Sequence, residues 1–306
     1  MGVRHALQKL RSRAALFVAV VLLGAGVARA ACPPAGETRA SLQALKEAQW
    51  RAPGRDDAAG HQALGLVDCL ADPDPVLRDA LAFDGLQTLM RAKLVDVATL
   101  QTIRARLLSV LAGPADGAGF HQPFAALVLA EVARADRLQP FLSAEQRAQL
   151  VEQGSAYLAR VRDYRGFDVH EGWRHGVAHG ADLMLQLSLN PQLAQAQADT
   201  MLTAIAAQVM PAGAQFYQYG EGERLMAPVF YLARRGWWQA EDWERWLAAL
   251  TARLPKDAAT TQAGLAARHN LGAFVTPLYV SVQESGDPAL AKLLLPGLRK
   301  ALQALD

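Results

Sequence analysis

Two histidines and an aspartate are spaced so that one face of a helix would present all three. His175, His179 and Asp182 stand at positions i, i+4 and i+7, which fall within roughly 60° of one another at 3.6 residues per turn. Imidazole and carboxylate groups can together transfer protons, bind a polar ligand or coordinate a metal ion. The spacing therefore predicts a candidate site on a helix over residues 172–188.

Zinc sites often use two histidines and a carboxylate, with a fourth position open for water. His175, His179 and Asp182 could supply that set to Zn²⁺ or another divalent metal. Gly176 stands where a zincin carries its catalytic Glu, so the metalloprotease motif is incomplete. Three interpretations stay open: a metal centre, a metal-free ligand-binding or catalytic site, and a polar stripe that packs the preceding loop.

The rest of the chain is predicted to be all-α, because Ala, Leu, Gln, Arg and Glu dominate and alternating β-branched runs are nearly absent. Helix-start signals recur about every 47 to 50 residues, at 95–96, 142–143, 189–191, 239–240 and 286–288. This period is at the long end of HEAT and armadillo units. We expect an α-α helical-repeat superhelix of about five helix pairs over residues 75–306. The first helices are predicted over 75–90, 122–133, 172–188, 223–235 and 265–284, and the second helices over 97–111, 144–161, 192–209, 241–254 and 288–305.

A superhelix of this kind would bring polar groups from successive first helices to one concave face. Aligning the repeats makes His175 equivalent to Arg224, and places residues 163–168 as a long charged and aromatic loop at one end of the face. Glu221, Glu223 and Arg224 could instead stabilise the first turn of a helix. The candidate ligand-binding residues are Asp163, Arg165, Trp173, His175, His179, Asp182, Glu221, Glu223 and Arg224, and the alignment adds Glu171, His269 and Asn270.

Four tryptophans gather around the helix start at 239–240. Trp237, Trp238, Trp243 and Trp246 could stack on sugar rings, but their positions in a turn and a second helix favour core packing.

The N-terminus is typical of a secretory signal peptide over residues 1–30. It has a basic segment, an apolar segment over 14–27 that is too short to span a bilayer, and an Ala28-Arg29-Ala30 cleavage site. Cys32 could be acylated in a lipoprotein, but Arg29 stands where that signal has a small aliphatic residue. We expect a periplasmic or secreted protein whose mature chain has no transmembrane segment.

Removal of the signal peptide changes the charge balance. It leaves 26 Lys and Arg against 29 Asp and Glu, so a formal charge of +2 becomes −3. The mature chain is therefore not predicted to bind nucleic acid.

Two cysteines remain after cleavage, Cys32 and Cys69. In an oxidising compartment we expect them to form one structural disulfide. It would tie down an N-terminal segment over residues 31–74, ahead of the repeat domain. A redox-active pair is not indicated, because the two are far apart in sequence.

The residues around the histidines resemble a family of bacterial proteins that is known only as a domain of unknown function. The shared signature is Trp-x-His-x-x-Ala-His-Gly-Ala-Asp-Leu over 173–183, preceded by Asp-Tyr-Arg-Gly-Phe over 163–167 and followed by an acidic-Arg-Leu segment over 220–225. The resemblance extends over about residues 75–305. It implies a helical-repeat fold and no particular activity.

The sequence thus predicts an exported helical-repeat protein that binds a periplasmic ligand or protein through its polar face. One alternative is a cell-envelope hydrolase or lyase, with or without a metal, that uses His175, His179 and Asp182 for proton transfer. Another is an architectural scaffold for envelope proteins. Metal analysis and turnover assays would separate these classes.

Overall fold

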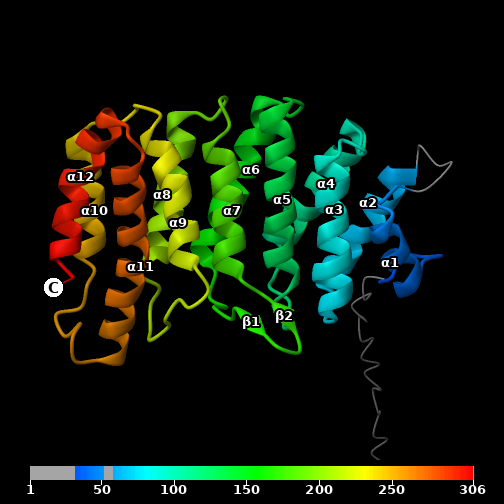
Figure 1. The fold of residues 1–306 in the computed structure, drawn as a ribbon, viewed down its shortest axis with the longest axis horizontal. Coiled ribbons are helices and arrows are strands. Elements are labelled where there is room, and N and C mark those ends of the chain that lie inside the picture. Colours follow the sequence, from blue (N-terminus) through cyan, green and yellow to red (C-terminus); the bar gives the residue numbers. More distant parts are fainter. Residues whose placement is uncertain (1–31, 52–57, 306) are drawn as a thin grey trace, which may run out of the picture.

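The computed structural model describes residues 32–51 and 58–305, and they are mostly helical. The helices lie side by side along the long axis of the molecule, and a short two-stranded hairpin projects near α5 and α7 (Figure 1). This confirms the all-α class, while the predicted signal peptide lies outside the described residues. The elements are α1 (Arg39–Glu47), α2 (Ala58–Asp68), the 3₁₀ turn η1 (Cys69–Ala71), the π-helical η2 (Val76–Phe83), α3 (Asp84–Arg91), α4 (Val97–Ala112), α5 (His121–Leu138), α6 (Ala144–Arg160), β1 (Phe167–Asp168), β2 (Gly172–Trp173), α7 (Gly176–Ser188), α8 (Gln195–Val209), α9 (Glu221–Ala233), α10 (Ala240–Thr251), α11 (Gln262–Glu284) and α12 (Pro288–Gln303).

Helices that alternate along the chain pack against one another. α3, α5, α7, α9 and α11 form one row in which each contacts the next, and α4, α6 and α8 form a second row behind it. The two rows are joined by contacts between successive helices such as α4 with α5 and α6 with α7. One continuous apolar cluster runs between the rows from Leu42 to Ala301, so each helix buries its apolar stripe against several neighbours.

Polar side chains donate hydrogen bonds to the ends of α4, α6 and α8 from residues that lie a regular interval later in the chain. Arg160 donates to the carbonyl of Leu111, 49 residues earlier, and Gln208 Nε2 donates to the carbonyl of Leu158, 50 residues earlier. Arg253 repeats the contact on the carbonyl of Ala206, 47 residues earlier. These donors satisfy carbonyl groups that a helix C-terminus leaves unpaired.

Most predicted helix starts coincide with observed caps. The side chains of Asp96, Ser143 and Asp287 accept hydrogen bonds from backbone N–H groups in the first turns of α4, α6 and α12. The start predicted at 189–191 is wrong, because α8 begins only at Gln195. Asn190 instead donates its amide to buried Asp136 and fixes the turn between α7 and α8.

A second correction concerns the helix that carries the histidines. The sequence predicts it from residue 172, but α7 begins at Gly176, and residues 172–173 belong to β2. His175 therefore precedes the helix on which His179 and Asp182 lie.

The predicted disulfide is present between Cys32 and Cys69. It joins the start of the described chain to the first residue of η1, directly after α2. Trp50 is buried in the same apolar core, with 2% of its surface exposed. The N-terminal segment thus contains two helices, α1 and α2, that the sequence analysis did not anticipate. Among the described residues, no helix has both the length and the apolar character needed to cross a bilayer.

Breaking this disulfide is expected to lower stability. The bond closes a loop with a sequence separation of 37 residues, which restricts the unfolded chain by about 4 kcal/mol on the chain-entropy model. We predict a loss approaching that value in the unfolding free energy of a Cys32→Ser, Cys69→Ser variant, measured by urea unfolding. The wild-type protein under reducing conditions should match the variant. Equal midpoints for oxidised and reduced wild type would contradict the prediction.

Candidate functional site

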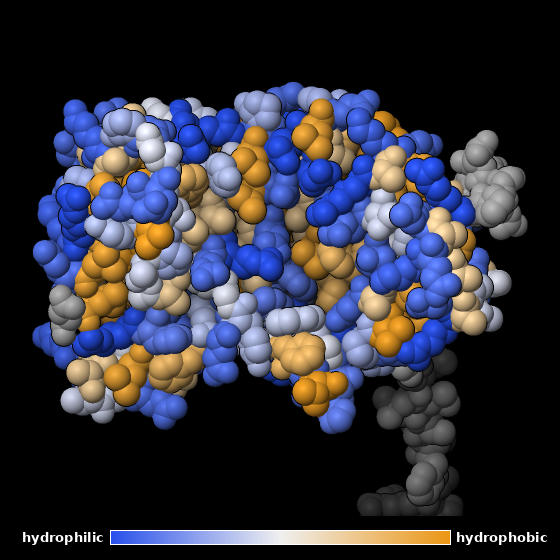
Figure 2. All heavy atoms as spheres, in the orientation of Figure 1, coloured by the Kyte–Doolittle hydropathy of each residue, from blue (hydrophilic) through white to orange (hydrophobic). Residues whose placement is uncertain are grey.

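The two histidines and Asp182 line one pocket of about 550 Å³ in the first row of helices. The side chains around it come from η2, α3, α5, β2, α7 and α9. This face of the molecule is hollowed along α5 and α7, with hydrophilic residues around the hollow (Figure 2). We call it the histidine pocket. Besides His175, His179 and Asp182, its lining includes Asp79, Phe83, Gln87, Arg91, Phe124, Glu131, Trp173, Gln186, Tyr219 and Arg224.

A β-hairpin places Trp173 and His175 at the pocket. β1 and β2 pair antiparallel, with Phe167 opposite Trp173. The pairing continues through a backbone hydrogen bond of 3.1 Å from His175 N to the carbonyl of Arg165. His175 then adopts a left-handed conformation with φ 55° and ψ 38° at the N-cap of α7. Because its backbone completes the hairpin, His175 cannot be part of the helix that the sequence predicts.

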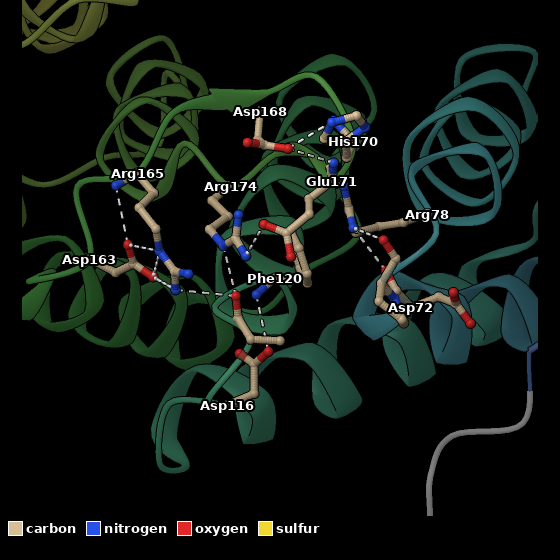
Figure 3. Close-up of polar contacts among 12 residues, drawn as sticks. Asp72, Arg78, Asp116, Phe120, Asp163, Arg165, Asp168, His170, Glu171 and Arg174 are labelled. Atoms are coloured by element: carbon tan, nitrogen blue, oxygen red, sulfur yellow. Dashed lines mark hydrogen bonds and ion pairs between the residues drawn. The ribbon is translucent and has the colours of Figure 1, made fainter.

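Two arginines hold this hairpin in place, and both contact the ring of Phe120. The guanidinium carbons of Arg78 and Arg174 lie 3.9 Å and 4.3 Å from the centre of the Phe120 ring. Arg78 also donates to the carbonyl of Glu171, and Arg174 Nε donates to the carbonyl of Ala118 at 2.7 Å (Figure 3). Arg78 is fully buried. These cation–π and charge-assisted contacts fix the hairpin to η2 and to the start of α5.

Gly172 allows the hairpin to approach η2 closely. Its φ is +73°, and a Cβ atom there would come within 3.0 Å of Pro75, Arg78 and Asp79. Only glycine combines this conformation with this space. The next residue, Trp173, can then donate its backbone N–H to Asp79 Oδ2 at 3.3 Å.

The imidazoles are held by aromatic contacts. The His175 ring stacks on Trp173, with centroids 4.8 Å apart and planes at 22°. The His179 ring meets His175 and Phe124 edge to face, at 5.6 Å and 5.2 Å. Only 7% of His175 and 6% of His179 are exposed. Within the described part of the chain, His175 Nε2 and His179 Nδ1 have no hydrogen-bond partner.

Burial keeps both imidazoles neutral at pH 7. It lowers the pKa of His175 to about 4, and the positive charge of Arg224 acts in the same direction. Burial also lowers the pKa of His179 well below its usual value, and electrostatic repulsion from His175 and Arg224 lowers it further. Each neutral ring has one donor and one acceptor nitrogen, so the two imidazoles add polar groups but no positive charge to the wall of the pocket.

The charged side chains of the pocket are paired with each other. Arg224 donates to both carboxylate oxygens of Asp182, at 2.7 Å and 2.5 Å, and Arg91 donates to both oxygens of Glu131, at 2.9 Å and 2.6 Å. Asp182 is 19% exposed, and burial raises its pKa although Arg224 opposes that effect. Asp79 has a partner in Arg78, whose Nε lies 2.6 Å from Oδ1. The positive and negative charges around the pocket therefore balance.

The structure brings together only some of the predicted site residues. Trp173, His175, His179, Asp182 and Arg224 line the histidine pocket, and buried Glu221 supports it. Glu221 accepts the backbone N–H of Tyr219 at 2.9 Å, and its Oε1 lies 3.8 Å from His175 Nε2.

The remaining predicted residues lie elsewhere. Asp163 and Arg165 pair with each other and line a separate pocket beyond the hairpin, so the loop anchors the hairpin from its outer side (Figure 3). Glu223 is exposed and does not line the histidine pocket. His269 and Asn270 bind the backbone of Tyr217 and hold the loop before α9.

The side chains do not fit a metal centre. Among residues 32–51 and 58–305, no group of three His, Cys, Asp or Glu side chains is placed to hold a metal ion. Asp182 gives both oxygens to Arg224, and a cation there would meet the guanidinium. The interpretation without a metal is therefore the one that the geometry favours.

Sequence reasoning missed one wall of the pocket, which α3 and α5 supply. Gln87, Arg91 and Glu131 form a hydrogen-bonded group there, with Gln87 Nε2 donating to Glu131 at 3.2 Å. The repeat period contained a usable signal, because a step of about 48 residues back from His179 reaches Glu131.

Comparison with known proteins gives one match. A family model described as a protein of unknown function (DUF2785) matches residues 107–280, which include α5 to α9 and the hairpin. No curated protein and no solved structure matches the chain.

The buried imidazoles are expected to make the fold acid-sensitive. With a pKa of about 4 when folded and about 6.5 when unfolded, His175 binds more protons in the unfolded chain between these values. Above pH 7 His175 is neutral in both states and does not destabilise the folded protein. As the pH falls, protonation of His175 in the unfolded chain lowers the free energy of unfolding. Relative to a His175→Gln variant, the wild type should lose about 2 kcal/mol of unfolding free energy between pH 7 and pH 5. Urea unfolding at both pH values measures this.

The raised pKa of Asp182 has the opposite effect on stability, but it is common to both proteins and cancels in the comparison. Replacement of exposed His61 by Gln is the matched control and should give no such difference. Parallel pH profiles for wild type and His175→Gln would show that His175 is not held neutral.

Proposed function

The chain belongs to the DUF2785 family, and we propose that it is an exported helical-repeat protein that binds a neutral, hydroxyl-rich ligand, such as a short glycan, in the histidine pocket. Trp173, His175, His179, Asp182 and Arg224 would make the contacts, with Gln87, Arg91 and Glu131 on the opposite wall. Glu221, which does not line the pocket, would support His175 from behind, and Tyr219 would contact both the His175 ring and the ligand.

The observation that carries this proposal is the pair of unpartnered imidazole nitrogens. A buried polar atom without a hydrogen bond costs about 1–3 kcal/mol, and His175 Nε2 and His179 Nδ1 both have this property while their side chains line a pocket. Protein atoms cover both nitrogens in this structure, so a ligand hydroxyl group would pair with them once the rings turn toward the pocket, and a hydroxyl can both donate and accept.

Charge balance narrows the ligand class. The arginines of the pocket are already paired with carboxylates and the imidazoles are neutral, so an ionic ligand would find no free counter-charge and would pay for its desolvation. Tyr219 and Phe124 add aromatic surface, which suits the apolar faces of sugar rings. A neutral polyhydroxyl compound matches both properties.

We also propose that the helix pairs over residues 75–306 form a HEAT-like superhelix. The contacts from Arg160, Gln208 and Arg253 to helix ends 47 to 50 residues earlier support a repeating unit of that length. The histidine pocket would then lie on the surface formed by the first row of helices.

Export to the periplasm or the cell exterior is part of the proposal. The disulfide between Cys32 and Cys69 is compatible with an oxidising compartment. It also disfavours a lipoprotein, since a Cys32 sulfur in a disulfide cannot carry a lipid.

A hydrolase or lyase acting on a cell-envelope polymer is a second candidate. It is favoured by the neutral imidazole of His175 beside the Glu221 carboxylate, 3.8 Å away, a combination that can act as a general base. Release of new reducing ends from a glycan by the wild type, but not by a His175→Phe variant, would establish this activity.

Ligand selectivity tests the binding proposal. In calorimetric titrations, neutral N-acetylglucosamine oligomers and glucose oligomers represent the expected class, while deacetylated cationic oligomers and uronic acid oligomers are its charged counterparts. We expect a neutral oligomer to bind at least about ten times more tightly than its charged counterpart, because an unpaired charge is costly to bury. Tighter binding of the charged oligomers would contradict the charge argument.

The His175→Phe variant tests the role of the imidazole. It keeps a ring on Trp173 but removes both nitrogens, so affinity for the neutral oligomer should fall about tenfold, while the melting temperature stays within a few degrees of wild type. His61→Phe is the matched control and should bind like the wild type. Unchanged affinity in folded His175→Phe would refute the proposed contact.

Export can be tested in a Gram-negative host. The full chain should reach the periplasmic fraction, and mass spectrometry of the intact mature protein should give a chain that begins at Ala31. An Ala30→Leu variant should remain uncleaved, because the cleavage site requires a small residue. A mature mass that includes residues 1–30 would overturn the prediction.

A further inference from the structure

A third pocket, of about 210 Å³, lies between α8 and α10 and shares no lining residue with the histidine pocket. Three indole rings line it, those of Trp238, Trp243 and Trp246, together with Asp199 and Asp242. We call it the indole pocket. These are tryptophans that the sequence analysis assigned to core packing, and that role accounts fully only for Trp243, which is 2% exposed.

Neighbouring indoles in this pocket stand nearly at right angles. Trp238 and Trp243 have ring centroids 5.3 Å apart and planes at 74°, and Trp243 and Trp246 are 6.0 Å apart with planes at 80°. Walls that meet in this way form a corner in which a compact group contacts more than one ring. A flat sugar ring instead needs one open indole face, so the geometry favours a rounded occupant.

Aromatic rings arranged as a corner attract cations. The face of an indole carries negative charge density, and several faces around one space are the usual way in which proteins bind quaternary ammonium groups. The pocket volume of about 210 Å³ accommodates a trimethylammonium group with a short tail. Trp237 already has a cation on its ring from within the protein, since the Arg235 guanidinium lies 5.3 Å from the ring centre.

The negative charge of the indole pocket also favours a cation. Asp199 accepts a hydrogen bond of 3.2 Å from Trp238 Nε1, and among the described residues it forms no ion pair. Asp242, by contrast, pairs with Arg245. The pocket therefore has one carboxylate whose charge no protein cation balances, whereas all the charges of the histidine pocket are paired.

We propose that the indole pocket is a binding site for a small quaternary ammonium compound, with Trp238, Trp243 and Trp246 contacting the methyl groups and Asp199 supplying the counter-charge. This site lies on the other row of helices and does not depend on the function proposed for the histidine pocket.

A pair of isosteres tests the charge requirement. Choline and 3,3-dimethyl-1-butanol have nearly the same shape, but only choline carries a positive charge. Binding to the wild-type protein is followed through the indole N–H signals in nitrogen-15 NMR spectra, where the Trp238 signal should shift. We expect choline to bind at least about ten times more tightly than the alcohol. Equal affinities, or shifts produced only by neutral sugars, would overturn the proposal.

Two variants separate the roles of the residues. Asp199→Asn keeps an oxygen that can accept from Trp238 but removes the charge, so choline affinity should fall severalfold while the affinity for the alcohol stays the same. Trp246→Leu removes one wall and should weaken choline binding at least as much. His61→Gln, at an exposed residue outside both pockets, is the control and should leave choline binding unchanged. Wild-type choline affinity in folded Asp199→Asn would refute the counter-charge role, and with it the proposed site.

Discussion

The stack of Arg78, Phe120 and Arg174 is the contact on which the histidine pocket depends. It joins η2, the start of α5 and the hairpin, three segments that are separated by more than forty residues from one to the next. A fully buried guanidinium is costly to desolvate, and Arg78 is retained because carbonyl oxygens, the Asp79 carboxylate and the Phe120 ring surround it. Once the hairpin is fixed in this way, the positions of Trp173 and His175 follow.

The same burial gives the site its chemistry. His175 and His179 are neutral because they are packed among aromatic rings. The two arginines that line the pocket, Arg91 and Arg224, form ion pairs with carboxylates of the same pocket. The two imidazole side chains line a space of about 550 Å³, while their unpaired nitrogen atoms are covered by the surrounding protein. The indole pocket has a different lining, with three tryptophans and a carboxylate that forms no ion pair among the described residues.

Contacts at the ends of α4, α6 and α8 recur at a regular interval. Each of Arg160, Gln208 and Arg253 reaches back by one interval to carbonyl groups that would otherwise lack partners. In the first row, α5, α7 and α9 lie in sequence order, and Arg91 and Glu131 line the same pocket as the histidines that come later in the chain.

The sequence by itself determined the helical class, most helix starts and the disulfide, because caps such as Asp96 and Ser143 and the apolar periodicity act within a few residues. It also identified His175, His179, Asp182 and Arg224 as a group. Only the tertiary structure decided that His175 lies ahead of α7 in a left-handed conformation, that Asp163 and Arg165 face another pocket, and that α3 and α5 supply the opposite wall. These features arise from contacts between distant segments, above all those of Arg78 with Phe120 and Glu171, and no local pattern of residues encodes such contacts.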